Sequence, residues 1–206
     1  MEHLNSKYNQ LCQENSDINE HLPTLFKYAS ECSSVFESGV RGVTSSYALF
    51  YGLTQSDFAD KRMVLNDIHE CKINEFSHIT CELGIKTDYI WKNNLDIEFE
   101  DHETFDLVFI DTWHIYGQLK RELAKFSKIT NKYIILHDTE VDRTDGETIR
   151  NNWNAQEQSE QSGFPVDEIN CGLQKAITEF LDCSPNWKLK EEFTNNNGLT
   201  ILEQIL

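Results

Sequence analysis

The stretch DLVFIDTWHIY, which runs from Asp106 to Tyr116, identifies the central strand of the fold. Its apolar run, Leu107 to Ile110, is short and continuous, as expected of a strand that is buried on both faces. The run stops at Asp111, and Trp113 and His114 follow before a helical pattern begins. A buried strand does not need a carboxylate, an indole and an imidazole at one end, so this cluster indicates a functional site.

Short apolar runs and helical patterns alternate along the rest of the chain. Four more runs are typical of strands, at residues 34–40, 61–69, 87–93 and 132–138, and helical spacing occurs at 18–32, 44–53, 75–84, 116–129 and 172–182. This alternation predicts a mainly parallel sheet with helices on both faces. Residues 186–204 contain two strand-like runs across an Asn-Gly turn. We therefore predict an α/β fold, a Rossmann-like, doubly wound, mainly parallel sheet with a C-terminal antiparallel hairpin.

One segment departs from the alternation. Residues 139–170, from Thr139 to Asn170, are polar and show no hydrophobic period. They are too many for an ordinary connection in a compact domain. A chain of 206 residues with 39% hydrophobic content can bury one sizeable core. We predict a single domain over residues 1–206, with a lid or mobile loop at 139–170.

Charge and cysteine usage limit the class of protein. The net charge is −17, from 35 acidic and 18 basic residues. Such a surface does not suit nucleic-acid phosphates or anionic membranes. The six cysteines form no CxxC pair, and the N-terminus has no signal-like apolar core. We predict a cytoplasmic protein with free thiols and with no nucleic-acid or membrane partner.

Polar side chains end each of the five predicted parallel strands. In chain order they are Glu37 before Gly39 and Gly42, then Asp67, then Asn93 and Asn94, then Asp111 with Trp113 and His114, and finally His137 with Asp138. The carboxyl ends of parallel strands meet at one edge of the sheet, where ligands bind in such folds. Taken singly these signals are weak, and a helix cap or a solvated turn explains Asp67 as well as a ribose contact does.

Five segments resemble one family. They are FESGVRGVTS, VLNDIH, FIDTWHIYGQLKREL, YIILHDT and NNNGLTIL, and from about Leu22 onward the chain resembles class I S-adenosylmethionine-dependent methyltransferases. The likeness is to small O-methyltransferases of catechol and rhamnosyl/macrocin type. The sequence departs from that pattern at Val43, where a third glycine is common. It also has His114 where catechol-type enzymes have lysine, and His137-Asp138 where they have an acid–amide pair.

The resemblance implies a cofactor site made from the strand ends. Glu37 would hold the methionine end of S-adenosylmethionine through its amino group. The other implied contacts are Gly39 and Gly42 beneath the cofactor, Ser45 near its carboxylate, Asp67 on the ribose, Asn93 and Asn94 at the adenine edge, and Trp113 on the adenine ring.

Methyl transfer to a hydroxyl also needs a group that takes up a proton. His114 is the best base by type, because its unperturbed pKa of about 6.5 lies near working pH. Asp111 and Asp138 would orient His114. Alternatively, Asp111, His137 and Asp138 would hold a divalent cation, Mg²⁺ or Mn²⁺, that activates the acceptor. Residue types alone leave both possibilities open.

These inferences predict an O-methyltransferase that acts on a hydroxyl of a sugar or glycan. The rhamnosyl-type resemblance and the polar segment at 139–170 both favour such an acceptor, since sites for flat aromatic acceptors are mainly apolar. A small-phenol or catechol O-methyltransferase is the alternative enzyme, and a non-catalytic cofactor-binding module is the alternative outside enzymes. The sequence is equally compatible with one module of a larger enzyme.

Overall fold

The computed structural model describes residues 1–205 and shows a seven-stranded sheet in the order β3-β2-β1-β4-β5-β7-β6. Its strands are β1 (Ser34–Ser38), β2 (Arg62–Asp67), β3 (Lys86–Trp91), β4 (Phe105–Ile110), β5 (Thr130–His137), β6 (Trp187–Phe193) and β7 (Leu199–Gln204). Strands β1 to β5 pair in parallel, whereas β7 pairs antiparallel with both β5 and β6. The predicted α/β fold with a C-terminal antiparallel hairpin is confirmed.

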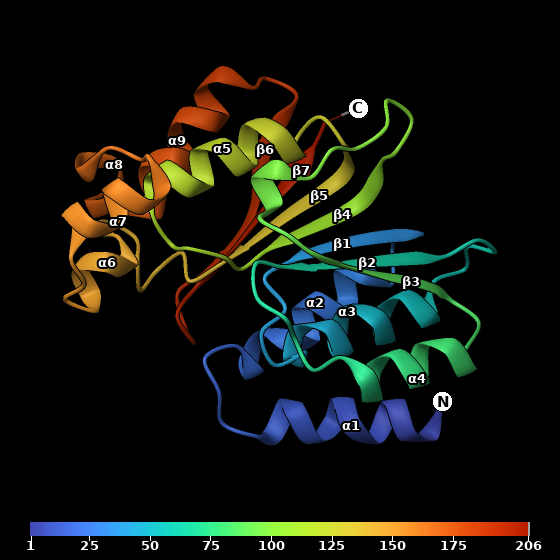
Figure 1. Ribbon diagram of the computed structural model, residues 1–206. Coiled ribbons are helices and arrows are strands. Elements are labelled where there is room, and N and C mark those ends of the chain that lie inside the picture. The colour runs from blue at the N-terminus through green and yellow to red at the C-terminus, as the bar shows by residue number, and fades with distance from the viewer. Residues whose placement is uncertain (206) are drawn as a thin grey trace.

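Helices cover both faces of the sheet (Figure 1). On one face lie α1 (Glu2–Gln13), α2 (Leu22–Ala29) with the short 3₁₀ turn η1 (Asn19–His21), α3 (Thr44–Gln55) and α4 (Asn74–Glu82). On the other lie α5 (Tyr116–Phe126) and α9 (Leu173–Cys183). Neighbouring residues of β4 point to opposite faces, so Phe109 packs in the core under α3 and Val108 in the core under α5. Because β4 is buried on both faces, its residues from Leu107 to Ile110 are all apolar.

The structure also bears on what the sequence predicts for the N-terminal region, for the cysteines and for membrane-spanning helices. Helix α1 was not predicted, because its residues are mostly polar and only Leu4 is buried. All six cysteines are free, in line with the predicted reduced thiols. Within residues 1–205, no helix has the length and apolar character needed to cross a lipid bilayer.

The segment 139–170 contains three short helices rather than an irregular loop. They are α6 (Glu147–Arg150), α7 (Ala155–Ser162) and α8 (Val166–Asn170). The amide of Glu147 donates to the carbonyl of His114 at 2.9 Å, and the amide of Tyr116 donates to the carbonyl of Cys171 at 2.7 Å. Helix α6 and the residue that follows the segment are therefore hydrogen-bonded to the loop that carries His114 and to the first residue of α5. Its role as a lid stays a prediction.

The loop after β1 and the end of β4 cross at close range. Strand β1 lies between β2 and β4, and the connections that follow β1 and β4 run to opposite faces of the sheet, which is the position where ligands bind in such folds. Gly39 has a φ of +94°, and a Cβ there would lie 1.8 Å from the carbonyl oxygen of Asp111. Only glycine fits, for reasons of both conformation and space.

We predict that Gly39→Ala destabilises the protein by about 2–5 kcal/mol, because it combines a left-handed backbone with a clash against main chain. Gly163→Ala is the matched control, since Gly163 has a φ of +76° but open space around it. That variant should lose only about 1 kcal/mol. Urea unfolding of the two variants measures the difference, and equal losses would show that the crossing at Asp111 is not tight.

Candidate active site

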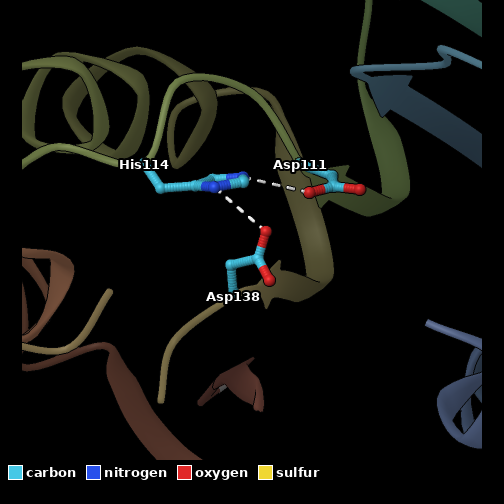
Figure 2. Close-up of side chains that lie close together, drawn as sticks. All are labelled: Asp111, His114 and Asp138. Carbon is cyan, nitrogen blue, oxygen red and sulfur yellow. Dashed lines mark hydrogen bonds and ion pairs between the residues drawn. The ribbon is translucent and has the colours of Figure 1, made fainter. Parts of the chain in front are cut away.

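Strands β4 and β5 bring three titratable side chains together beyond their carboxyl ends. Asp111 follows β4, His114 lies in the loop before α5, and Asp138 follows β5. In Figure 2 the imidazole of His114 lies between the two carboxylates. Its Nε2 is 3.1 Å from Oδ1 of Asp111, and its Nδ1 is 2.9 Å from Oδ2 of Asp138. The strand ends therefore converge as the sequence predicts.

Two further carboxylates reach the same imidazole from the segment 139–170. Oδ2 of Asp142 lies 3.2 Å and Oε2 of Glu147 lies 3.8 Å from Nδ1 of His114. Asp142 is fully buried and also accepts two hydrogen bonds from Arg150, at 2.6 and 2.8 Å. Sequence reasoning missed both acids. The signal that was available is the density of acids in TEVDRTDGET, directly after the end of a strand.

The surrounding carboxylates raise the pKa of His114. Burial alone would lower this pKa, but the hydrogen bond to Asp111 and the charges of Asp138 and Asp142 outweigh burial and raise the pKa well above 6.5. Nδ1 lies 2.9 Å from Asp138 and 3.2 Å from Asp142 but makes no well-aligned hydrogen bond within the described chain. The sequence reasoning used the ordinary pKa of histidine, and the role of His114 as the base stays a prediction.

His137 is held on both sides by protein atoms. Its Nδ1 lies 3.2 Å from Oδ1 of Asp111, and its Nε2 lies 3.0 Å from the carbonyl of Asp17. Burial alone would lower the pKa of His137, but Asp111 raises it. Because both nitrogens are engaged, His137 would have to give up one contact to bind a metal. Its predicted role as a ligand stays a prediction that this geometry does not favour.

Asp111, His114 and Asp138 form a second group of side chains that could hold a cation. One ligand atom from each of these residues lies within 4.8 Å of the others. Oδ1 of Asp138 is buried and has no hydrogen-bond partner within the described chain. Asp138 also has a φ of 57°, a left-handed conformation that is uncommon outside glycine. Two carboxylates with one imidazole are a donor set suited to Mg²⁺ or Mn²⁺.

Glu37 provides a buried carboxyl group on β1. It is fully buried, and its Oε1 accepts a hydrogen bond of 2.5 Å from Ser45. Its other oxygen, Oε2, has no hydrogen-bond partner among the described residues. Burial raises the pKa of Glu37 to about 8, and the hydrogen bond from Ser45 only partly offsets that effect. A buried carboxylate with a free oxygen suits a cationic ligand group.

Asp67 accepts hydrogen bonds from the loop after β1, which contains Gly39 and Gly42. This role is separate from any contact with a ligand. Oδ2 of Asp67 accepts from the amides of Val40 and Arg41, at 2.9 and 3.0 Å, and its Oδ1 accepts from the amide of His69 at 2.8 Å. Burial alone would raise the pKa of Asp67, but these amides lower it. The loop passes through Gly42, and Val43 takes a φ of 59° where the family commonly has glycine. The ribose contact of Asp67 stays a prediction.

The predicted adenine contacts are differently arranged. Asn94 is buried, and its amide donates to Ser38 and Glu122 and accepts from Gln118, so it is saturated by protein groups. Asn93 accepts from the amide of Leu95 and caps a 3₁₀ turn. The structure therefore gives both asparagines a role in the protein itself. Their contact with adenine stays a prediction.

Trp113 is half-buried and stacks on another side chain of the protein. Its ring lies 6.0 Å from that of Phe164, at an interplanar angle of 13°, and Phe164 comes from the segment 139–170. The indole N–H of Trp113 is buried without a partner among the described residues. The cavity that runs from Trp113 to His114 and Glu122 has a volume of about 10 Å³, room for roughly one water molecule.

Two exposed apolar residues stand beside Asp67. Ile68 is 58% and Trp91 is 61% exposed, at the ends of β2 and β3. The indole N–H of Trp91 donates to the carbonyl of Ile68 at 3.0 Å, which holds the pair together. Sequence reasoning missed this surface. An apolar residue directly after a polar strand end was the available signal.

Comparison with known proteins gives a result for structure only. No protein-family model and no curated protein matches the sequence. Among solved structures, the O-methyltransferase TomG from Streptomyces achromogenes, in complex with S-adenosylmethionine, is 13% identical, with a TM-score of 0.61. The match covers 97% of this chain and 90% of TomG. An O-methyltransferase from Bacillus cereus, in complex with S-adenosylhomocysteine, is 17% identical, with the same coverages and TM-score.

The N-methyltransferase NodS from Bradyrhizobium japonicum WM9 is also similar. It is 12% identical, with a TM-score of 0.57, and the match covers 91% of this chain and 94% of NodS. The chain therefore has the fold of S-adenosylmethionine-dependent methyltransferases. This confirms, at the level of fold, the resemblance seen in the sequence.

We predict a pH dependence of stability that comes from Glu37. Its pKa is about 8 in the folded protein, against an ordinary value of 4.5. Between these values the folded state keeps a proton that the unfolded state has lost, so this group's contribution to stability falls as pH rises and levels off above about pH 8. Glu37→Gln removes the titration. Relative to wild type, it should therefore gain stability from pH 5 to pH 8.

Urea unfolding across that range measures the effect. Glu98→Gln is the control, because Glu98 is exposed, and its difference from wild type should stay constant with pH. A constant difference for Glu37→Gln as well would show that Glu37 ionises normally in the fold.

Proposed function

We propose that this protein is an S-adenosylmethionine-dependent O-methyltransferase. One observation carries the proposal. The buried carboxyl of Glu37, with one unpaired oxygen, and the cluster of Asp111, His114 and Asp138 lie at the carboxyl ends of the neighbouring strands β1, β4 and β5. The similar structures from Streptomyces achromogenes and Bacillus cereus, which hold S-adenosylmethionine and S-adenosylhomocysteine, support the choice of cofactor.

The chain offers groups for each part of that cofactor. Glu37 faces its amino group, because a cation returns the buried carboxyl to its charged form at little cost. Asp67 accepts hydrogen bonds from the ribose hydroxyls. Ile68 and Trp91 form the apolar surface on which the adenine lies. Bound S-adenosylmethionine supplies the electrophilic methyl group, and the protein aligns the acceptor oxygen with it.

Asp111 and Asp138 would hold a divalent cation through their carboxylate oxygens, and His114 would stay unligated beside it. The cation would neutralise the carboxylates that raise the pKa of His114, and it would lower the pKa of an acceptor hydroxyl. His114, next to Asp138, would then take up the proton of that hydroxyl. In this proposal the cation and the base act together.

The acceptor is a hydroxyl of a sugar or glycan. The groups of the segment 139–170 that approach His114 are the carboxylates of Asp142 and Glu147, and Arg150 pairs with Asp142. Such side chains match the many hydroxyls of a sugar better than they match a phenol ring. The segment acts as a lid over this acceptor. The free thiols support a cytoplasmic location, and the net charge supports the absence of a nucleic-acid partner.

We predict that methyl transfer needs a divalent cation held by Asp138. Turnover with radiolabelled cofactor, measured on monosaccharides, glycosides and catechols, should fall on the order of 100-fold in Asp138→Asn or after chelation. Added Mg²⁺ or Mn²⁺ should restore the chelated wild type only. His114→Ala should lose about 10²–10⁴ in turnover while it keeps cofactor affinity.

Thermal unfolding provides a readout that does not depend on the acceptor. Mn²⁺ at about 100 times its Kd should stabilise wild type by about 2.7 kcal/mol. This gain should vanish in Asp138→Asn and persist in Asp57→Asn, an exposed acid that precedes β2. Chelator-resistant turnover would contradict the cation. Cofactor binding without turnover on any acceptor would support a non-catalytic module, and turnover on catechols alone would support the phenol acceptor.

A further inference from the structure

Arg41 lies in the turn between β1 and α3 and forms an ion pair with the N-terminal part of the chain. Its Nη2 lies 2.9 and 2.8 Å from the two carboxylate oxygens of Asp17. Arg41 has a φ of 43°, so the turn holds it in a left-handed conformation. Its side chain is 77% exposed, whereas that of Asp17 is 33% exposed. The guanidinium therefore projects from the turn toward Asp17 and remains accessible.

Asp17 contacts residues at the carboxyl ends of two strands, β1 and β5. Its side chain binds Arg41 after β1, and its backbone carbonyl accepts from Nε2 of His137 at the end of β5. Strand β4, which carries Asp111 at its end, lies between β1 and β5 in the sheet. The chain around Asp17 therefore bridges the edge at which the proposed cofactor binds.

The charges at this edge are poorly matched to the methionine end of the cofactor. That end carries an ammonium and a sulfonium, which suit Glu37, Asp67 and Asp111, and it also carries a carboxylate. An unpaired carboxylate among these acids would be repelled. His114 and His137 are both already bound to Asp111. Arg41 is a cationic side chain in the turn between β1 and α3, and its guanidinium is accessible.

We infer that Arg41 binds the α-carboxylate of S-adenosylmethionine, and that Asp17 occupies this position until the cofactor arrives. This inference rests on the proposed function. The carboxylate of Asp17 is the same chemical group as the one it stands in for, and both of its oxygens accept from Nη2 of Arg41. Cofactor binding exchanges one carboxylate for the other and releases the segment around Asp17 from the turn.

Two ligands that differ only in the carboxylate test the inference. Calorimetry measures the binding of S-adenosylmethionine and of its decarboxylated form to wild type and to Arg41→Ala. Loss of a charged pair should weaken the first ligand about 10- to 100-fold, and the second less than about 3-fold. A merely structural role for Arg41 would weaken both alike. Arg62→Ala is the matched control, because Arg62 is also ion-paired to an acid but lies at the opposite end of β2.

Asp17→Asn tests the exchange. It removes the competing charge and keeps the shape, so S-adenosylmethionine should bind several-fold more tightly to this variant. The gain should disappear when Arg41→Ala is also present, because nothing is then left to compete for. Equal effects of Arg41→Ala on both ligands, or no effect on either, would overturn the inference and leave the proposed function standing. Failure of wild type to bind either ligand would overturn both.

Discussion

Gly39 meets the carbonyl oxygen of Asp111 at a distance that leaves no room for a side chain, and this crossing fixes the geometry of the whole edge. The amide of Asp111 donates to the carbonyl of Ser38 at 2.8 Å, so the pairing of β1 with β4 continues past both strand ends. Glu37 and Asp111 are thereby kept at fixed positions on neighbouring strands. Because both strands are buried on both faces, neither can shift without opening the core. The sheet therefore holds a site built on these residues in a fixed geometry.

The electrostatics of the site follow from one shared oxygen. Oδ1 of Asp111 lies 3.1 Å from His114 and 3.2 Å from His137, so a single carboxylate orients two imidazoles from different strand ends. Burial alone would raise the pKa of Asp111, but these two partners lower it strongly. Asp111 therefore stays charged, and the ring of His114 is aimed at Asp138. Loss of Asp111 would free both histidines at once, which is why its effect cannot be assigned to either histidine alone.

The sequence predicted the sheet, its hairpin and the convergence of the strand ends, because apolar periodicity and strand adjacency determine these features. It did not predict α1 or the helices of the segment 139–170, whose residues are largely polar and carry little periodic signal. It also did not predict that Asp142 and Glu147 lie beside His114, because these acids approach the ring only after the chain has folded back on itself. Local patterns do not report such contacts between distant segments.

The same edge concentrates features that a purely structural sheet would avoid. Oε2 of Glu37, the indole N–H of Trp113 and Oδ1 of Asp138 are buried without hydrogen bonds within the described chain, and such groups each cost about 1–3 kcal/mol. Val43 and Asp138 add left-handed backbone after β1 and after β5. The packing of the sheet beneath the edge offsets these unfavourable free energies. A ligand that brings cationic and hydrogen-bonding groups to the edge would satisfy the same atoms. The unpaired buried atoms and the left-handed backbone therefore favour a ligand-binding role for this edge of the sheet.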